Sequence, residues 1–174
     1  MPTNLELKAS IDSPKEILLI AKRIGRSRGT LVQTDTYFSV PDGRLKLREV
    51  PNRLGELISY RRNEGKGERW SDYSVYRVRN AAALKKALCR VFQIDIIVRK
   101  RRKLFLYRGA RIHIDHVLGL GDFIEFEVVV RKGRRGARAV YAELMKLFLI
   151  GRKKVIRSSY ADLVREKRRK LKLV

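Results

Sequence analysis

Charged and apolar residues alternate along several segments of this chain with a period of two. Reading every second position within these segments gives a series in which nearly every residue is ionisable: Glu6, Lys8, Lys46, Arg48, Ser59, Arg61, Lys100, Arg102, Arg111, His113, Asp115, Glu125 and Glu127. The positions between them are almost all apolar, as at Leu5 and Leu7 or at Ile112 and Ile114. Because successive side chains of a β-strand point to opposite faces, each segment is expected to be a strand with one charged and one apolar side.

The rest of the chain supplies turns and helices around these strands. Strands are expected at about 5–11, 30–40, 44–50, 57–62, 72–77, 94–107, 110–117 and 123–130. Helices are expected from Pro14 to about Ile24 with Ser13 as N-cap, after the N-cap Asn80, after Gly136, and over 160–171, where the last helix is highly basic. Strands thus outnumber helices by about two to one.

The charged face of the sheet has two possible environments. It could be the solvated outer face of an ordinary sandwich or barrel, which is the usual state of a single charged strand face. However, the amphipathic helices must cover apolar surface, and the apolar parity of the strands is the only large surface of that kind. The sequence therefore favours an α+β, mostly β fold: a closed tunnel or barrel of about eight antiparallel strands with helices packed outside and charge inside.

Composition bounds the partners of the chain. A length of 174 residues suits a single domain over 1–174, and 42 Lys and Arg against 18 Asp and Glu give a formal charge of +24, which favours anionic ligands. Cys89 is the only cysteine and is expected to be a small buried residue of its helix. No apolar run is long enough for a signal peptide or a membrane span, so we expect a cytoplasmic protein without membrane contact, as a monomer or homodimer.

The motifs resemble those of the CYTH superfamily, the triphosphate tunnel metalloenzymes, which includes class IV adenylyl cyclases and thiamine triphosphatases. The resemblance spans nearly the whole chain. It rests on Leu5-Glu6-Leu7-Lys8, Gln33-Thr34-Asp35-Thr36-Tyr37-Phe38, Leu45-Lys46-Leu47-Arg48, Ser59-Tyr60-Arg61, Val98-Arg99-Lys100-Arg101-Arg102, Arg111-Ile112-His113-Ile114-Asp115, Phe123-Ile124-Glu125-Phe126-Glu127 and Ser158-Ser159-Tyr160-Ala161-Asp162-Leu163. Such a tunnel holds a triphosphate with basic side chains and a divalent metal with acids.

The resemblance implies a role for each matching residue. Triphosphate binding falls to Lys8, Lys46, Arg48, Arg61, Lys100, Arg102, Arg111 and His113, and Mg²⁺ or Mn²⁺ binding to Glu6, Asp115, Glu125 and Glu127. Catalysis is expected to depend on Glu6, Lys8, Arg111 and Asp115. Asn4 replaces the first glutamate of the family pattern, which leaves the metal site one negative charge short and puts a second metal in doubt. His116 replaces an acid and, by parity, points away from Asp115.

Three functions remain open on the sequence. The first is a metal-dependent enzyme that hydrolyses or cyclises a nucleoside triphosphate, inorganic triphosphate or thiamine triphosphate. The second is a polyanion or RNA binder without catalysis, supported by the basic runs Arg99–Lys103, Arg131–Arg135 and Arg165–Lys170, in which Arg99, Arg101 and Lys103 point outward by parity. The third is a degenerate relative that binds triphosphates without turning them over, for which Asn4 is the motive.

Overall fold

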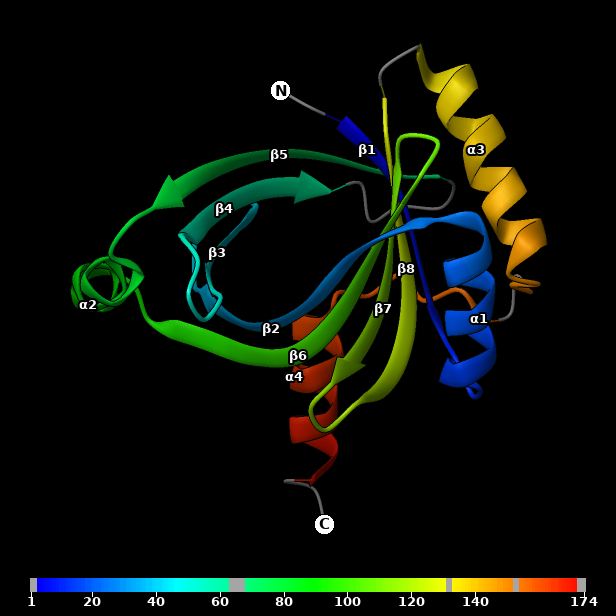
Figure 1. Cartoon of the computed structure of the whole chain (residues 1–174). Coiled ribbons are helices and arrows are strands. Elements are labelled where there is room, and N and C mark those ends of the chain that lie inside the picture. The colour runs from blue at the N-terminus through cyan, green and yellow to red at the C-terminus, as the bar shows by residue number, and fades with distance from the viewer. Residues whose placement is uncertain (1–2, 63–67, 131–132, 152–153, 172–174) are drawn as a thin grey trace.

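Eight antiparallel strands form the body of the molecule. The computed structural model describes residues 3–62, 68–130, 133–151 and 154–171. Its strands are β1 (Thr3–Ser10), β2 (Arg26–Phe38), β3 (Arg44–Glu49), β4 (Gly55–Arg62), β5 (Arg69–Val78), β6 (Ile94–Tyr107), β7 (Ala110–Val117) and β8 (Gly121–Val129). They close into a ring in the order β1-β5-β4-β3-β2-β6-β7-β8, as Figure 1 shows. The expected closed barrel of about eight antiparallel strands is confirmed.

The helices lie outside this ring. They are α1 (Pro14–Ile24), α2 (Ala81–Val91), α3 (Gly133–Leu147) and α4 (Tyr160–Leu171). In Figure 1, α1 and α3 cover one side of the ring beside β1, β7 and β8, α2 lies at the opposite side, and α4 extends below β2 and β6 and contacts β6. Among the described helices, none has the length and apolar composition needed to cross a membrane.

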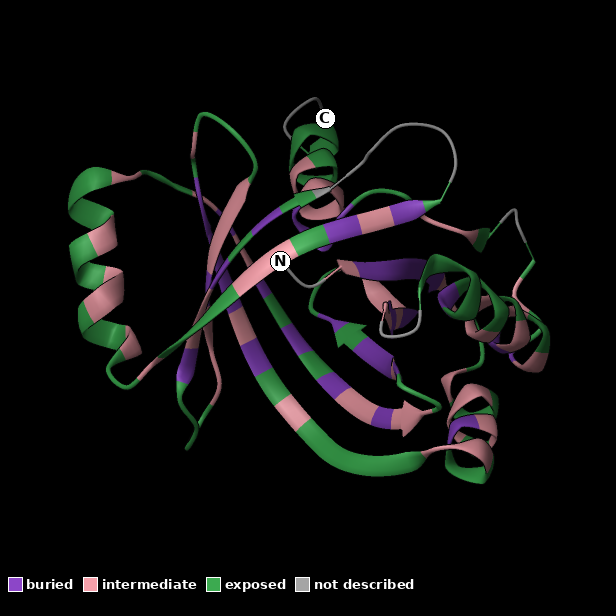
Figure 2. Cartoon of the chain, turned by 90° about the horizontal axis from the view of Figure 1, so that it is seen from above, coloured by how far each residue is buried: buried purple, intermediate pink, exposed green. Residues whose placement is uncertain are grey.

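The main apolar core lies between the outer face of the barrel and the helices α1 and α3. Leu7, Ile112 and Phe126 are at most 1% exposed there, and Phe126 meets Phe148 with ring centroids 5.3 Å apart. The alternation of buried and exposed positions along the strands is visible in Figure 2. Because the helices take up the apolar parity outside, the charged parity of these strands must face the interior.

The structure tests the predicted N-cap residues of α1 and α2 and the predicted burial of Cys89. Asn80 caps α2 as expected, since its Oδ1 accepts a hydrogen bond of 2.9 Å from the Ala83 amide. Ser13 is the N-cap residue of α1 as expected, but its side chain makes no capping hydrogen bond, and the helix begins with Pro14 and has Glu16 in its first turn. Cys89 is exposed rather than buried, because α2 lies at the margin of the barrel and none of its residues is buried.

The strand β4 reverses the parity that the sequence predicted. Ile58 and Tyr60 face the interior, whereas Ser59 and Arg61 are exposed. The register explains this, because Lys46 on β3 pairs directly with Ile58, and directly paired residues share a face. The Arg61 side chain is 76% exposed and forms an ion pair with Asp42 outside the tunnel. The expectation that Arg61 faces a bound triphosphate is therefore not met by its position.

Candidate active site

One wall of the tunnel is basic and is organised by a single buried carboxylate. Asp35 on β2 is 0% exposed and accepts hydrogen bonds from Arg48 Nε at 2.7 Å, Arg48 Nη2 at 3.1 Å, Lys100 Nζ at 2.7 Å and Lys46 Nζ at 3.2 Å. The register places Asp35 opposite Arg48, and Gln33 opposite Lys100. Three cations from β3 and β6 thus converge on one internal anion.

The charges of this wall perturb one another strongly. Burial by itself would raise the pKa of Asp35, but Arg48, Lys100 and Lys46 hold it well below its usual value. Burial is also the main reason why the pKa of Lys100 falls to about 8, and Arg48 and Arg102 lower it further against the attraction of Asp35. Asp35 therefore stays ionised near neutral pH, whereas Lys100 loses its proton around pH 8.

The opposite wall is built from β1, β8 and β7 and carries the acids. Cross-strand pairing forms two rows of side chains: Glu6, Glu127 and Arg111 in the first, and Lys8, Glu125 and His113 in the second. Arg111 Nε lies 2.8 Å from Glu127 Oε2, and Lys8 Nζ lies 3.8 Å from Glu125 Oε1. Glu6 and Glu127 face each other directly, an arrangement of like charges that is unfavourable without a cation nearby.

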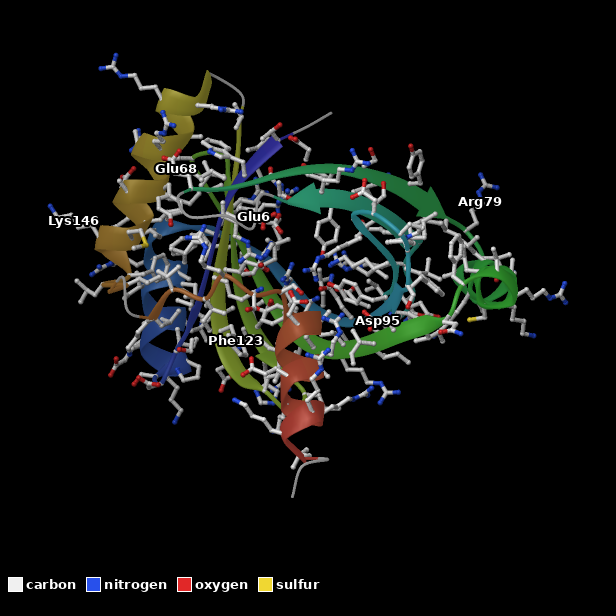
Figure 3. The ribbon with its side chains drawn as sticks, turned by 180° about the vertical axis from the view of Figure 1, so that it is seen from behind. Glu6, Glu68, Arg79, Asp95, Phe123 and Lys146 are labelled. Carbon is white, nitrogen blue, oxygen red and sulfur yellow. The ribbon has the colours of Figure 1, made fainter. Side chains whose placement is uncertain are left out.

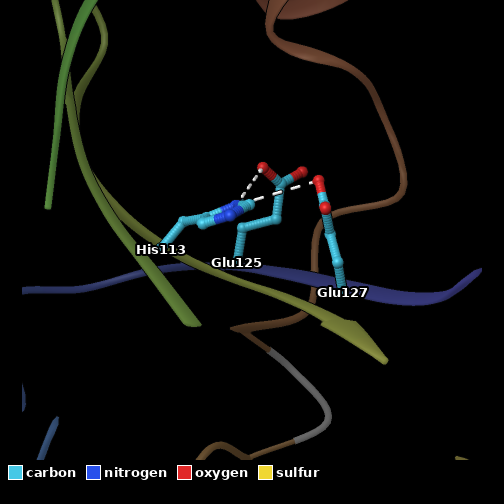
Figure 4. Close-up of side chains that lie close together, drawn as sticks. All are labelled: His113, Glu125 and Glu127. Carbon is cyan, nitrogen blue, oxygen red and sulfur yellow. Dashed lines mark ion pairs between the residues drawn. The ribbon is translucent and has the colours of Figure 1, made fainter. Parts of the chain in front are cut away.

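Three side chains of this wall lie close enough to share one metal ion. His113, Glu125 and Glu127 each offer a ligand atom, and these atoms lie within 4.8 Å of one another. Nδ1 of His113 is 3.6 Å from Glu125 Oε2 and 3.8 Å from Glu127 Oε1, as the dashed lines of Figure 4 show. Burial would raise the pKa of Glu125, but Lys8, His113 and Arg102 hold it well below its usual value. His113 and Arg111 likewise outweigh burial and lower the pKa of Glu127, so both carboxylates are ionised at neutral pH.

These residues fit a divalent cation, and the types of their ligand atoms decide which metal ion they prefer. Two carboxylates are hard oxygen ligands that suit Mg²⁺ or Mn²⁺, and an imidazole ligand is better accepted by a transition metal than by Mg²⁺. Asn4 lines the same cavity, is 3% exposed, and its Oδ1 has no hydrogen-bond partner among the described residues. A buried amide oxygen of this kind is available as a neutral ligand to a cation or to its water.

Asp115 joins the two walls instead of facing the cavity. Its oxygens accept bonds of 2.7 and 2.6 Å from Arg102 Nε and Nη2, and the Tyr160 hydroxyl donates to it at 3.0 Å. Arg102 also donates to Glu125 at 2.8 Å. Asp115 thus holds the Arg102 fork in place, and its predicted role as a metal ligand is not supported by these bonds.

The first turn of α4 closes one side of the cavity. Lys8 Nζ lies 4.0 Å from the centre of the Tyr160 ring and donates to the Ser158 carbonyl at 3.1 Å. Arg44 on β3 holds this turn by donating to Ser159 Oγ at 2.9 Å and to Asp162 Oδ1 at 3.0 Å. The basic helix predicted from residue 160 therefore contributes its first turn to the site, while its later residues are exposed.

The predicted site residues share one cavity with two exceptions. Figure 3 shows side chains filling the ring, with Glu6 toward the interior and Arg79 and Lys146 at opposite outer sides. The cavity has a volume of about 280 Å³ and is lined by these predicted residues: Glu6, Lys8, Lys46, Arg48, Lys100, Arg102, Arg111, His113, Glu125 and Glu127. Only Arg61 and Asp115 of the predicted set are absent from its lining.

Sequence reasoning missed three charged residues of the interior. Asp35 shares the parity of Gln33 and Tyr37, both of which line the cavity, so parity within that motif could have indicated it. Arg69 is 7% exposed, with its Nε 3.5 Å from Glu6 Oε2, but it precedes the segment predicted as a strand. Glu56 lines the cavity and was hidden by the reversed parity of β4.

A closed antiparallel tunnel with helices outside, converging cations on one wall and an acidic cluster on the other, defines the class of fold and site. The CYTH domain profile matches residues 3–160, and the chain belongs to the CYTH family. No curated protein matches the chain.

Solved structures share the fold at low sequence identity. A conserved hypothetical protein from Pyrococcus furiosus superimposes with a TM-score of 0.81 at 20% identity, covering 92% of this chain and 99% of the other. A Vibrio parahaemolyticus protein described as a "putative adenylate cyclase" gives 0.76 at 19% identity, with coverages of 92% and 97%. A Hippeastrum protein, described as an adenylyl cyclase candidate with a dominant triphosphatase activity, gives 0.67 at 13% identity, with 96% of each chain covered.

Proposed function

We propose that this protein is a divalent-metal-dependent enzyme that binds a triphosphate inside the tunnel and hydrolyses or cyclises it. One observation carries the proposal: six cations from four strands converge on one cavity whose other wall holds the acidic cluster. The cations are Lys8, Lys46, Arg48, Lys100, Arg102 and Arg111. Buried charges need partners, and a bound triphosphate would add oxygen acceptors to those that Asp35, Asp115, Glu125 and Glu127 already supply to these cations.

The basic residues would act as a preorganised clamp. Arg48 and Arg102 are held rigidly by the buried carboxylates Asp35 and Asp115, so their orientation does not depend on substrate. Guanidinium forks match phosphate oxygens bidentately, and Lys46 and Lys100 add compact point charges. Cations fixed in this way stabilise negative charge that develops on the phosphoryl oxygens during transfer.

The acidic wall would hold the metal through Glu125, Glu127 and His113. A bound Mg²⁺ or Mn²⁺ would neutralise phosphate charge and orient the phosphates for in-line displacement. In hydrolysis, a water oxygen attacks the terminal phosphorus, the bond to the bridging oxygen breaks, and diphosphate leaves. In cyclisation, a ribose hydroxyl attacks the innermost phosphorus and pyrophosphate leaves.

Support for a nucleoside triphosphate comes from the aromatic part of the cavity. Tyr37, Tyr60 and Tyr73 line it, and Tyr37 is only 6% exposed. Their rings offer faces on which a base could stack, and the hydroxyl of Tyr37 already accepts a bond of 3.3 Å from Lys46. An inorganic triphosphate would use the clamp without the rings, so the substrate series below separates the two cases.

A product analysis tests the proposal directly. The protein is incubated with ATP, inorganic triphosphate or thiamine triphosphate in the presence of Mg²⁺ or Mn²⁺, and phosphate, pyrophosphate and cyclic AMP are resolved. Phosphate without cyclic AMP assigns hydrolysis, with pyrophosphate as the second product when the substrate is inorganic triphosphate, and cyclic AMP with pyrophosphate assigns cyclisation.

A matched pair of variants then tests the clamp. The double substitution Lys46→Gln/Arg48→Gln should lower kcat/KM at least about 100-fold, because each charge-assisted bond contributes about 1.5–3 kcal/mol. Arg61→Gln, outside the tunnel, is the control and should stay within about twofold of the wild type. Normal turnover by the double variant would refute the tunnel assignment.

A second function, triphosphate binding without turnover, is favoured by Asn4. This residue lines the cavity with its Oδ1 lacking a hydrogen-bond partner among the described residues, so a neutral ligand stands where the family pattern has a carboxylate. Binding of ATP without any product, together with turnover in Asn4→Glu, would support this alternative over the enzyme.

A further inference from the structure

The outer face of β6 carries a row of cations that the tunnel does not use. Arg99 and Arg101 are exposed, and Lys103 is half-buried. They alternate with the tunnel residues Lys100 and Arg102, so they point away from the cavity. Their outward orientation, predicted from the sequence, is confirmed.

The described residues that pair with this row across the sheet include no acid, and on the β7 side Arg101 faces His116 and Lys103 faces Ile114. Across the β2–β6 pair, Arg99 faces Thr34, Arg101 faces Val32 and Lys103 faces Thr30. Among the described residues, no carboxylate forms an ion pair with any of the three cations. An opposite charge at such a cross-strand position would stabilise the pair of strands.

Some exposed cations elsewhere are paired: Arg108 with Glu143 at 2.8 Å, Arg138 with Glu68 at 2.7 Å, and Lys154 with Asp12 at 2.7 Å. A formal charge of +24 leaves many other cations without an acid. The β6 row is therefore distinguished by its regular spacing on one strand face, not by the lack of an acid alone.

A groove continues from this row along the edge of α2. It has a volume of about 480 Å³ and is lined by residues that include Val32, Thr34, Glu49, Arg53, Lys85 and Arg99. Its acid, Glu49, is already engaged by Lys85 at 2.8 Å, and no described carboxylate pairs with Arg53. The groove and the β6 row together form one basic track, defined by Arg53, Arg99, Arg101 and Lys103.

We infer that this basic track binds the sugar-phosphate backbone of a single-stranded nucleic acid, outside the tunnel and without catalysis. Alternate residues of a strand lie about 6.8 Å apart, so the β6 row extends for about 14 Å, longer than one triphosphate needs. The spacing of about 6.8 Å between neighbouring cations is twice the axial rise of about 3.4 Å per nucleotide in a stacked duplex, so it suits the longer phosphate spacing of an extended, unstacked strand.

The chemistry of the track also predicts the mode of recognition. The described lining of the groove and the residues that pair with the β6 row include no Phe, Tyr or Trp, and the one ring beside the row is the imidazole of His116, which already contacts Asp122 at 2.9 Å. The row therefore lacks the large aromatic platforms on which bases stack. Phosphate contacts carry no sequence information. The binding is accordingly independent of base sequence and strongly dependent on salt.

The test measures binding of a fluorescent 20-nucleotide RNA with a 5′-hydroxyl by anisotropy between 0.05 and 0.3 M salt, and repeats it with DNA of the same sequence. A 5′-hydroxyl gives the tunnel no triphosphate to bind. The double variant Arg99→Gln/Arg101→Gln should reduce the salt slope by about 1.4, since each single-strand phosphate contact contributes about 0.7. If the variant and the wild type bind equally at 1 M salt, the variant binds about 25-fold more weakly at 0.1 M, which lies inside the measured range.

Two controls keep this inference separate from the proposed function. Arg135→Gln/Lys146→Gln removes the same charge from α3, on the side of the barrel away from α2 in Figure 1, and should change affinity less than about twofold. Lys46→Gln/Arg48→Gln should bind the RNA normally while losing triphosphate binding.

The inference is overturned if both surface double variants weaken binding equally, because net charge alone would then explain it. It is also overturned if the tunnel variant loses RNA binding. A third contrary result is a protein that binds phosphatidylserine vesicles through Arg99 and Arg101 but does not bind the RNA.

Discussion

Asp35 is the residue on which the basic wall of the tunnel depends, and Asp35→Asn tests that dependence. The substitution keeps the shape of the side chain but removes the charge that receives four hydrogen bonds from Lys46, Arg48 and Lys100. Removing one partner from a buried ion pair costs about 3–5 kcal/mol. The lower end applies here, because Lys46 and Arg48 are 12% and 14% exposed and can gain water from the cavity.

A loss of about 3 kcal/mol is measurable by thermal unfolding. With about 2.1 cal/mol/K of unfolding entropy per residue, a chain of 174 residues should lose about 8 °C in Tm. The same substitution removes an anion that competes with phosphate, since two unit charges 4 Å apart interact by about 4 kcal/mol at an effective dielectric constant of 20. Inorganic triphosphate should therefore raise the Tm of the variant more than that of the wild type.

The assay follows Tm by circular dichroism at increasing concentrations of inorganic triphosphate. Asp42→Asn is the control, because Asp42 and its partner Arg61 are 69% and 76% exposed, and exposed pairs contribute about 0–1 kcal/mol. If Asp35→Asn unfolds within about 1 °C of the wild type, then the buried carboxylate does not stabilise the cations and the reasoning is wrong. If the variant gains less from triphosphate than the wild type, then Asp35 does not compete with the phosphate, and its part in orienting Arg48 outweighs its negative charge.

Three further predictions concern the charge of the tunnel. Triphosphate affinity should fall as pH rises above about 8, because the empty protein then loses the Lys100 proton, which the bound anion stabilises. Calorimetry should detect proton uptake when triphosphate binds at pH 8. Lys100→Met should abolish both effects. Glu127→Gln should weaken Mn²⁺ binding at least tenfold by electron paramagnetic resonance, whereas Glu143→Gln on α3 should leave it unchanged. His113→Asn should weaken Mn²⁺ more than Mg²⁺, since Mg²⁺ takes oxygen ligands and gains little from imidazole.

Each of these has a contrary outcome. A flat affinity between pH 7 and 9.5 would mean that Lys100 is not in contact with the bound triphosphate. Equal Mn²⁺ affinities of Glu127→Gln and the wild type would move the metal away from the His113 cluster, and equal losses of both metals in His113→Asn would argue for a structural role of the imidazole.

The sequence determined the layers of this protein. On β1, β7 and β8, strict alternation leaves no doubt about the apolar side, and the amphipathic helices α1 and α3 need that side for their own burial. Charge must then line the interior, as it does at Lys8, Glu125 and His113. Alternation and helix amphipathicity are local properties, so they can be read before any strand is paired.

Tertiary structure decided which strand faces turn inward where alternation is ambiguous. On β4, Ile58 and Tyr60 compete with Ser59 and Arg61, and only the pairing of Lys46 with Ile58 settles that the apolar pair lines the tunnel. Asp35 was hidden for a related reason. A lone acid in a strand has no local sign of its partners, and its three cations come from residues 11 to 65 positions away.

The sequence by itself thus determined that the chain is mostly β, that one face of its strands is nearly all ionisable, and that β6 carries a second, outward row of cations. Only the closed barrel decided that Asp35 holds three cations, that Asp115 faces Arg102 instead of the cavity, and that Arg61 lies in solvent. The physical reason is that periodicity assigns a side chain to a face, whereas its partners are set by register across strands that are distant in sequence.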